Sequence, residues 1–129
     1  MTLRHILFAL ALTATPAFAA DPVLGLFKTQ PDDNGAFGHV EMYECGDAIC
    51  GVIRKAFNPD GSPRQSRNIG KRLIWDMQPQ GDGRYGKGRI WAPDRDKVYS
   101  SKMELSGNSL KVSGCVIGIC RAQSWSRVQ

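Results

Sequence analysis

Four cysteines are the residues in this chain whose spacing most clearly indicates chemistry. They occur as two pairs with the same four-residue gap, Cys45 and Cys50 in CGDAIC and Cys115 and Cys120 in CVIGIC. Residues this close in the sequence can face each other across a β-hairpin at the separation of a disulfide. We therefore predict two local bridges, each of which stabilises the fold by about 2 kcal/mol.

Two other functions of cysteine fit this spacing less well. Four thiolates could bind zinc, but the cysteine pairs of zinc sites usually have two intervening residues. A thioredoxin-like redox site needs the C-x-x-C spacing at the start of a helix. An oxidising compartment also favours disulfides over thiolate ligands. We expect neither a metal site nor a cofactor.

His39 is the second residue that could do chemistry. The other histidine of the chain, His5, lies in the N-terminal leader, so a three-histidine metal site is excluded. His39 and Glu41 alternate in the sequence HVE and share one face of a strand with Tyr43, which would let Glu41 orient His39 as a general base. A solvated strand face of alternating polar residues explains the same pattern, and we expect no catalytic residue.

Motifs of other enzyme and metal-binding classes are absent. The sequence contains no G-x-S-x-G and no phosphate-binding loop. The sequence Asp32-Asp33-Asn34-Gly35 resembles the start of a calcium loop, but the bidentate acid that should follow is missing. We interpret it as a turn, and a non-enzymatic function is the prediction.

The N-terminus has the three-part pattern of a cleavable secretory signal over residues 1–19. A basic start is followed by an apolar run from Ile6 to Leu12 and by the small-residue triplet Ala17-Phe18-Ala19. We expect cleavage after Ala19 and a periplasmic or secreted protein. A membrane-spanning helix needs roughly 20 apolar residues, and no run in this chain approaches that length.

Residues 20–129 have the length of one domain with a modest core. The whole chain has 17 Lys and Arg against 12 Asp and Glu, and the signs are interleaved, as in Asp94-Arg95-Asp96-Lys97. A nucleic-acid-binding surface needs clustered positive charge, so we predict no nucleic-acid partner. We expect this single domain to be a monomer.

Residues 20–129 have the pattern of short strands joined by tight turns. The expected strands are Val23–Gln30, Phe37–Cys45, Ile49–Phe57, Arg72–Gln78, Arg84–Trp91, Lys97–Leu105, Ser109–Val116 and Cys120–Val128. Strands joined in this way pair with their neighbours, and eight of them close into a barrel because closure removes unpaired edges. We predict an all-β, eight-stranded antiparallel up-and-down barrel. The alternative is a two-sheet sandwich, for which only the connection 58–71 is long enough to cross over.

Four segments of the chain together resemble one protein family. They are DPVLGLFKT, GHVEMYECGDAICGVI, Gly88-x-Ile90 leading into KVYSSKMEL, and LKVSGCVIGICRAQSWSRV. In this combination they are similar to the small exported bacterial proteins catalogued as domain of unknown function 2147. The resemblance covers nearly all of residues 20–129. It implies a calycin-like, lipocalin-type barrel of eight strands and no particular activity.

The first and last strands carry a pattern that is typical of calycins. Gly25-x-Phe27 stands where lipocalins have Gly-x-Trp, and Arg127 stands where an arginine packs over that aromatic ring. The first and last strands of a closed barrel are neighbours, so a cation–π contact of about 1 kcal/mol is expected between them. The alternative is that both are ordinary strand residues.

Alternating side chains on two strands could line a ligand pocket. Tyr99 and Met103 share a face of one strand, and Gln123, Trp125 and Arg127 share a face of another. We predict that these five residues bind a small apolar, amphipathic or anionic ligand, or an envelope component. A barrel of this size can also be filled by its own side chains. In that case Trp125 is a core residue, and a ligand site would lie at the open end near Tyr99, Met103 and the basic connection 58–71.

The connection 58–71 suggests a different class of function. Basic residues lie within it and at both of its ends: Arg54, Lys55, Arg64, Arg67, Lys71 and Arg72. Long loops in compact domains are often functional, and this one could bind an anionic ligand or an acidic partner. A flexible, solvated connection explains the same composition. A protein-interaction module that uses this loop and the barrel surface is therefore one alternative function. A cryptic enzyme that uses His39 is another.

Overall fold

Nine β-strands make up the regular structure of the part of the chain that the structure describes. This structure, a computed structural model, describes residues 2, 9–10 and 20–129, so the predicted signal peptide over residues 1–19 lies outside it except at three positions. The strands are β1 (Gly25–Lys28), β2 (Phe37–Cys45), β3 (Ala48–Phe57), β4 (Pro63–Arg64), β5 (Arg72–Gly81), β6 (Arg84–Ala92), β7 (Lys97–Ser106), β8 (Ser109–Val116) and β9 (Ile119–Arg127).

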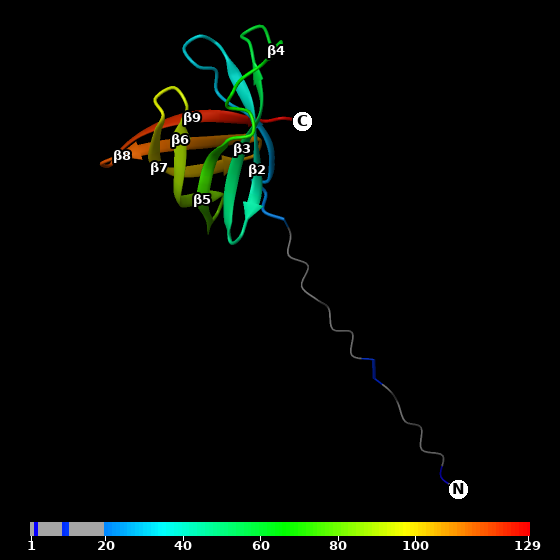
Figure 1. Cartoon of the computed structure of the whole chain (residues 1–129). Coiled ribbons are helices and arrows are strands. Elements are labelled where there is room, and N and C mark those ends of the chain that lie inside the picture. Colours follow the sequence, from blue (N-terminus) through cyan, green and yellow to red (C-terminus); the bar gives the residue numbers. More distant parts are fainter. Residues whose placement is uncertain (1, 3–8, 11–19) are drawn as a thin grey trace.

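Eight of these strands form a closed antiparallel barrel. Each long strand pairs with its neighbours in sequence, from β1 and β2 through β3, β5, β6, β7 and β8 to β9 (Figure 1). The barrel closes where β9 returns to β1, with Phe27 opposite Arg127 and Lys28 opposite Ser126. This confirms the predicted eight-stranded up-and-down barrel and excludes the two-sheet sandwich. The additional strand, β4, is a two-residue piece inside the connection 58–71 that pairs with β3.

The first strand is shorter than the sequence pattern predicts. The pattern indicated Val23–Gln30, whereas β1 spans only Gly25–Lys28, because residues 21–24 form a turn in which the Leu24 amide donates to the Asp21 carbonyl at 3.1 Å. The closing ladder between β1 and β9 is therefore short. Beyond it, the Gln30 side-chain oxygen accepts from the Ser124 amide at 3.0 Å.

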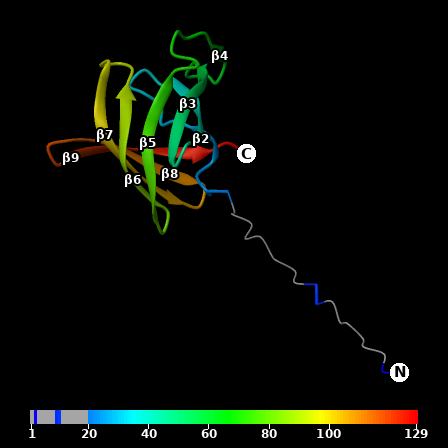
Figure 2. The ribbon, with the colours of Figure 1, turned by 60° about the horizontal axis from the view of Figure 1, so that its bottom comes forward.

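The two ends of the barrel are covered differently. The closed end carries the turns after β2, β5 and β7 and the segment 20–24, while the open end carries the connections 29–36, 58–71, 93–96 and 117–118. In Figure 2, β8 and β9 run roughly horizontally, whereas β5, β6 and β7 run roughly vertically. The sheet is therefore strongly twisted and curved. Turns at the open end thus come from four different parts of the sequence.

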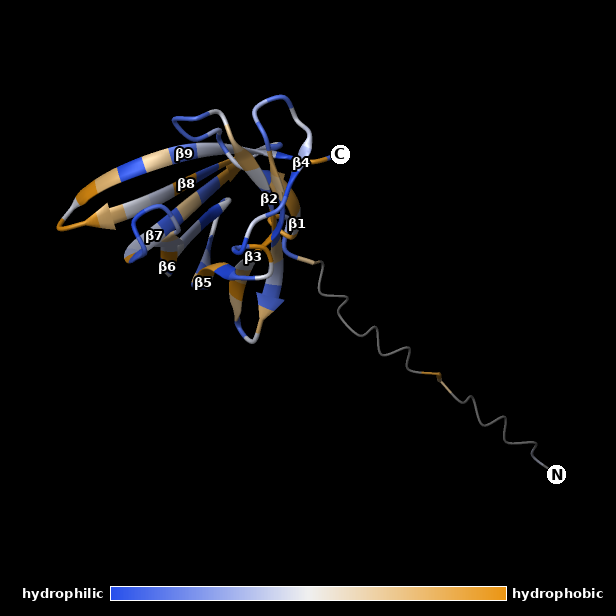
Figure 3. Ribbon diagram, turned by 45° about the horizontal axis from the view of Figure 1, so that its top comes forward, coloured by the Kyte–Doolittle hydropathy of each residue, from blue (hydrophilic) through white to orange (hydrophobic). Residues whose placement is uncertain are grey.

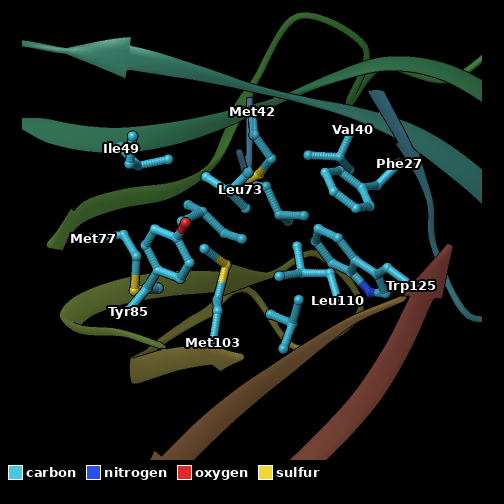
Figure 4. Close-up of a cluster of buried hydrophobic side chains, with 13 residues drawn as sticks. Phe27, Val40, Met42, Ile49, Leu73, Met77, Tyr85, Met103, Leu110 and Trp125 are labelled. Atoms are coloured by element: carbon cyan, nitrogen blue, oxygen red, sulfur yellow. The ribbon is translucent and has the colours of Figure 1, made fainter. Parts of the chain in front are cut away.

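Alternation along the strands places one set of side chains in the core. In β7, for example, Ser101 and Met103 are buried while their neighbours Ser100, Lys102 and Glu104 are exposed. Figure 4 shows how the apolar side chains of this set pack together inside the barrel. The buried cluster consists of Val23, Phe27, Val40, Met42, Ile49, Leu73, Ile74, Met77, Tyr85, Met103, Leu110, Val112 and Trp125.

Two glycines make room for methionines in this core. A Cβ atom on Gly51 would lie 2.9 Å from the Met42 sulfur, and one on Gly88 would lie 2.7 Å from the Met77 terminal carbon. Flexible methionine side chains fill irregular gaps, so a glycine opposite a methionine keeps the packing dense without a large second side chain.

Both predicted disulfides are present. Cys45 is joined to Cys50 across the hairpin of β2 and β3, and Cys115 is joined to Cys120 across the hairpin of β8 and β9. The predicted local pairing is confirmed. Because all four thiols are oxidised, they cannot form the thiolate site of a zinc ion.

Candidate functional site

A layer of contacts around Arg127 covers the closed end. Its guanidinium carbon lies 4.6 Å from the centre of the Phe27 ring, which confirms the predicted cation–π pair. One guanidinium nitrogen donates to the Leu24 carbonyl oxygen at 3.0 Å, and the other donates to the Pro22 carbonyl oxygen. Through these hydrogen bonds Arg127 holds the turn 21–24 against the last strand. We call this group of contacts the floor.

A second contact joins the floor to the opposite wall of the barrel. The Tyr85 hydroxyl of β6 donates to the Asp21 carboxylate, which also accepts from the Val23 amide at 2.9 Å. Burial, and then the adjacent Asp21 carboxylate, raises the pKa of Tyr85, so the phenol stays protonated and remains a donor. Val23 is itself completely buried in the core. The floor thus closes this end with both apolar and polar contacts.

Two of the predicted ligand-binding residues belong to the packed half of the barrel next to this floor. Met103 and Trp125 lie in the buried cluster, and Trp125 is only 2 % exposed (Figure 4). The Trp125 indole nitrogen donates to the side-chain oxygen of Gln123 at 3.0 Å. Arg127 is occupied by the floor contacts. These positions act in packing and closure, and their contact with a ligand stays a prediction.

The open half of the barrel presents partly exposed side chains on the same inward face. In register, Val112 lies opposite both Met103 and Gln123, and Gly114 lies opposite both Ser101 and Arg121. Because side chains alternate, Arg121 and Gln123 point to the same side of β9 as the buried Trp125, yet both are exposed. The inward face thus changes from packed to accessible half-way along the strands.

An apolar surface lies on β6 and β7, separated from these polar side chains by β8. Tyr99 of β7 pairs with Ile90 of β6, and both are half-buried. A Cβ atom on Gly114 would lie 3.4 Å from an Ile90 methyl carbon and 3.6 Å from the Tyr99 Cβ atom, so these residues pack on one side of the sheet. The predicted residues Tyr99 and Gln123 therefore belong to the open half. Ile90 and Arg121 were not predicted as site residues, although the alternation of Gln123, Trp125 and Arg127 reaches Arg121 when it is continued towards the start of the strand.

Comparison with known sequences identifies the family. A sequence model described as "Uncharacterized protein conserved in bacteria (DUF2147)" matches residues 25–127. The chain belongs to this family. The match begins at the glycine that precedes Phe27 and ends at Arg127, so it spans the barrel from its first strand to its last. The search of curated proteins found no match.

Comparison with solved structures shows that the DUF2147 chain has a lipocalin-like fold. Protein HP1028 from Helicobacter pylori, which is described as belonging to the lipocalin family, superposes with a TM-score of 0.68 and covers 83% of this chain and 83% of its own. The two sequences are 15% identical, so the similarity is one of fold. It agrees with the floor, in which an arginine of the last strand covers an aromatic ring of the first.

His39 does not form a pair with Glu41 in this DUF2147 barrel. The Glu41 carboxylate instead accepts from the Arg54 guanidinium at 3.3 Å. The His39 ring lies 4.5 Å from the Phe57 ring, and its Nδ1 atom is buried without a hydrogen-bond partner. Phe57 also stacks on Phe37 at 5.0 Å. His39 is thus part of an aromatic cluster on the outer face of β2 and β3.

We expect this environment to make the stability of the fold depend on pH. Burial, followed by the charges of Lys55 and Lys28, lowers the pKa of His39 below its usual value of 6.5. The unfolded chain therefore binds a proton more readily than the folded chain as the pH falls below about 6.5. We expect the free energy of unfolding to decrease as the pH falls through this window. His39→Gln, measured by urea unfolding at a series of pH values, should remove that decrease. An identical pH dependence in both proteins would contradict it.

The basic connection 58–71 is partly engaged with the barrel. Lys71 lies over the Trp91 ring at 5.3 Å, and Arg72 lies over the Trp75 ring at 5.0 Å. Arg64 and Arg67 are exposed.

Among the described residues, no group of three or more His, Cys, Asp or Glu side chains could hold a metal ion, and no helix has the length and apolar character to cross a membrane.

Proposed function

We propose that this protein is an exported barrel that binds a small amphipathic ligand in its open half. The change along the inward face, from the packed Trp125 to the accessible Gln123 and Arg121, is the observation that carries the proposal. Pockets of small-ligand carriers are mostly apolar with a few placed polar groups. The floor supports this function because it fills and seals the opposite end. Two disulfides are typical of a protein that works outside the reducing cytoplasm.

The residues of the open half indicate the chemistry of the ligand. Tyr99 and Ile90 offer an aromatic and an aliphatic surface for an apolar portion. Arg121 offers a guanidinium group for an anion, and Gln123 offers an amide whose oxygen is already occupied by Trp125. A carboxylate attached to an alkyl chain would satisfy both surfaces.

The role of Arg121 can be tested with two probes that share a twelve-carbon chain and differ in whether the head group is charged. We expect dodecanoate to bind the wild-type protein, and Arg121→Gln to weaken this binding by about tenfold, the loss of one charge-assisted contact. Binding of dodecanol should not change in the same variant. Tyr99→Ala should weaken the binding of both probes, because it removes apolar contact area. Isothermal titration calorimetry measures all of these affinities.

Lys111→Gln is the matched control for Arg121→Gln. Lys111 lies on β8 opposite Glu104 and Ser124, and its exposed side chain points away from the barrel interior. Its substitution removes one positive charge from the same hairpin and should leave both affinities unchanged. Equal effects of Lys111→Gln and Arg121→Gln, or no binding to the wild-type protein, would refute the proposed site.

A further inference from the structure

The tip of the β8–β9 hairpin is an exposed apolar cluster. Ile117 is 97% exposed, Ile119 is 74% exposed and Val116 is 49% exposed. Val98, on the adjacent strand β7, is 51% exposed. Figure 3 shows the hairpin projecting from the barrel with a hydrophobic tip. The disulfide Cys115–Cys120 holds the base of this tip, so we refer to residues 116–119 with Val98 as the apolar tip.

The turn at this tip places a β-branched residue, Ile117, in a left-handed backbone conformation. Ile117 has a φ of 48° and Gly118 a φ of 75°, a left-handed pair in a two-residue hairpin turn. Asn and Asp are favoured in the first position of such turns, whereas a β-branched residue there is strained. The turn between β5 and β6 has nearly the same geometry, with φ of 55° and 75°, and uses Asp82 and Gly83. Turn formation therefore does not explain an isoleucine at position 117.

Positively charged side chains lie on one side of the apolar tip. Arg121 follows directly after Cys120 on β9, and neither β8 nor β9 carries a carboxylate side chain. Beside the tip, the outer surface of β6, β7 and β8 has a shallow depression of about 380 Å³. Lys87, Arg89 and Lys102 line it together with Cys115. An anionic surface that met the tip would also meet these cations.

The pairing of the strands shows how far the depression lies from the apolar tip. Arg89, Ser100, Cys115 and Cys120 lie opposite one another in a row across four strands. Neighbouring strands are about 4.8 Å apart, so the Arg89 backbone is about 10 Å from that of Cys115. Two carboxylates of this region are Asp96, in the turn 93–96, and Glu104 of β7. Asp96 accepts from the Trp91 indole at 2.9 Å, and Glu104 lies opposite Arg84 and Lys111.

We propose that the apolar tip inserts into the surface of an anionic lipid bilayer, and that Lys87, Arg89 and Lys102 contact the lipid headgroups. Aliphatic side chains gain free energy when they leave water for the acyl region, and nearby Lys and Arg side chains strengthen the attraction to anionic lipids. A specific protein interface buries roughly 1,200–2,000 Å², far more than four aliphatic side chains supply. A bilayer needs no shape complementarity to a protruding tip. Docking of this kind goes beyond ligand binding and does not depend on it.

Such docking would place the ligand site next to the bilayer. The apolar tip belongs to the open end of the barrel, and Arg121 of the proposed ligand site follows directly after Cys120. A bound tip therefore turns the open half towards the lipid, so that an amphipathic ligand could pass between bilayer and barrel without crossing water.

Vesicle flotation tests this proposal through the unfavourable turn residue. We expect the oxidised protein, residues 20–129, to bind vesicles that contain phosphatidylglycerol, to bind pure phosphatidylcholine weakly, and to be released by salt. Ile117→Asn should weaken the binding by about tenfold or more, because it removes the most exposed aliphatic side chain. The same substitution should leave the melting temperature unchanged or higher, because Asn suits the left-handed conformation. Loss of binding then cannot be attributed to unfolding.

Two further variants test whether vesicle binding depends on the apolar tip in particular, or on any exposed apolar or charged side chain. Ile69→Asn is the matched control, since Ile69 is 43% exposed in the connection 58–71, and it should bind vesicles like the wild type. Arg89→Gln combined with Lys102→Gln should reduce the preference for phosphatidylglycerol and leave the weak binding to phosphatidylcholine unchanged. Equal binding of Ile117→Asn and wild type would overturn the proposal. Concentration-dependent dimerisation that Ile117→Asn abolishes, seen by sedimentation without lipid, would overturn it in favour of self-association.

Discussion

Trp125→Ala is expected to lower the free energy of unfolding by about 3–5 kcal/mol, the cost of removing a large ring from a packed core. The Trp125 ring is buried in the cluster that also contains Phe27 and Leu110. The substitution also leaves the Gln123 side-chain oxygen without its donor, the indole nitrogen 3.0 Å away. A small domain has a total stability of roughly 5–15 kcal/mol, so this loss is a large part of it. Urea unfolding followed by circular dichroism measures the change without the lost fluorophore.

Trp75→Ala is the matched control for this experiment. Trp75 has the same side chain on β5, but it does not belong to the buried cluster, and Arg72 lies over its ring at 5.0 Å. We expect a loss of about 1 kcal/mol, the contribution of a surface cation–π contact. If Trp125→Ala also costs less than about 1 kcal/mol, the side chain does not lie in a packed core. The ligand site would then have to be extended from the open half down to Trp125.

Much of the fold was predictable because the information for it is local. The four-residue gap between Cys45 and Cys50 already restricts the two thiols to one hairpin, and alternation around Met103 already assigns an inward face. Closure of the barrel followed from the number of strands and the short turns between them. Even the contact between Phe27 and Arg127 could be predicted, since a closed barrel makes the first and last strands neighbours.

The hydrogen bonds of the floor were not predictable in the same way. They join residues that are far apart in sequence, with a separation of 64 residues for Asp21 and Tyr85 and of 103 for Leu24 and Arg127. Val23 looked like the first residue of a strand because it is apolar and β-branched. In the structure a turn places it in the core instead, since tertiary contacts override weak strand propensity.

The candidate site, like the fold, was predictable only in part. Alternation correctly grouped Gln123, Trp125 and Arg127 on one face of the last strand, but it could not show where along that face packing ends. Arg127 lies at the closed end with the carbonyl oxygens of the turn 21–24 around it, and Arg121 lies at the open end with solvent around it. The two arginines are equivalent in the alternation of the last strand and differ in their tertiary surroundings. The calycin-like pattern distinguished Arg127 as the partner of Phe27, but no pattern in the sequence indicated that Arg121 is exposed on the inward face.

Arg127→Met is expected to open the floor and to lower the free energy of unfolding by about 2–3 kcal/mol. Methionine keeps an unbranched apolar stem over Phe27 but cannot donate to the carbonyl oxygens of Pro22 and Leu24. A hydrogen bond from a charged group contributes roughly 1.5–3 kcal/mol, and the cation–π contact adds about 1 kcal/mol. The Arg127 guanidinium is partly exposed to solvent, which weakens these contacts. We therefore expect a loss in the lower part of the range that the hydrogen bonds and the cation–π contact span together. Equilibrium urea unfolding gives the value.

Arg127→Lys distinguishes geometry from charge in the same position. If the floor needed only a positive charge near Phe27, lysine would restore most of the stability. The guanidinium instead reaches two carbonyl oxygens and one ring face at once, which a single ammonium group on a flexible stem cannot do. We therefore expect Arg127→Lys to recover less than half of the loss. Faster amide hydrogen exchange at Val23 and Leu24 in both variants would locate the damage at the floor, because these amides donate to Asp21 only while the turn 21–24 is held in place. Unchanged exchange there, with the same loss of stability, would show that Arg127 acts elsewhere in the barrel.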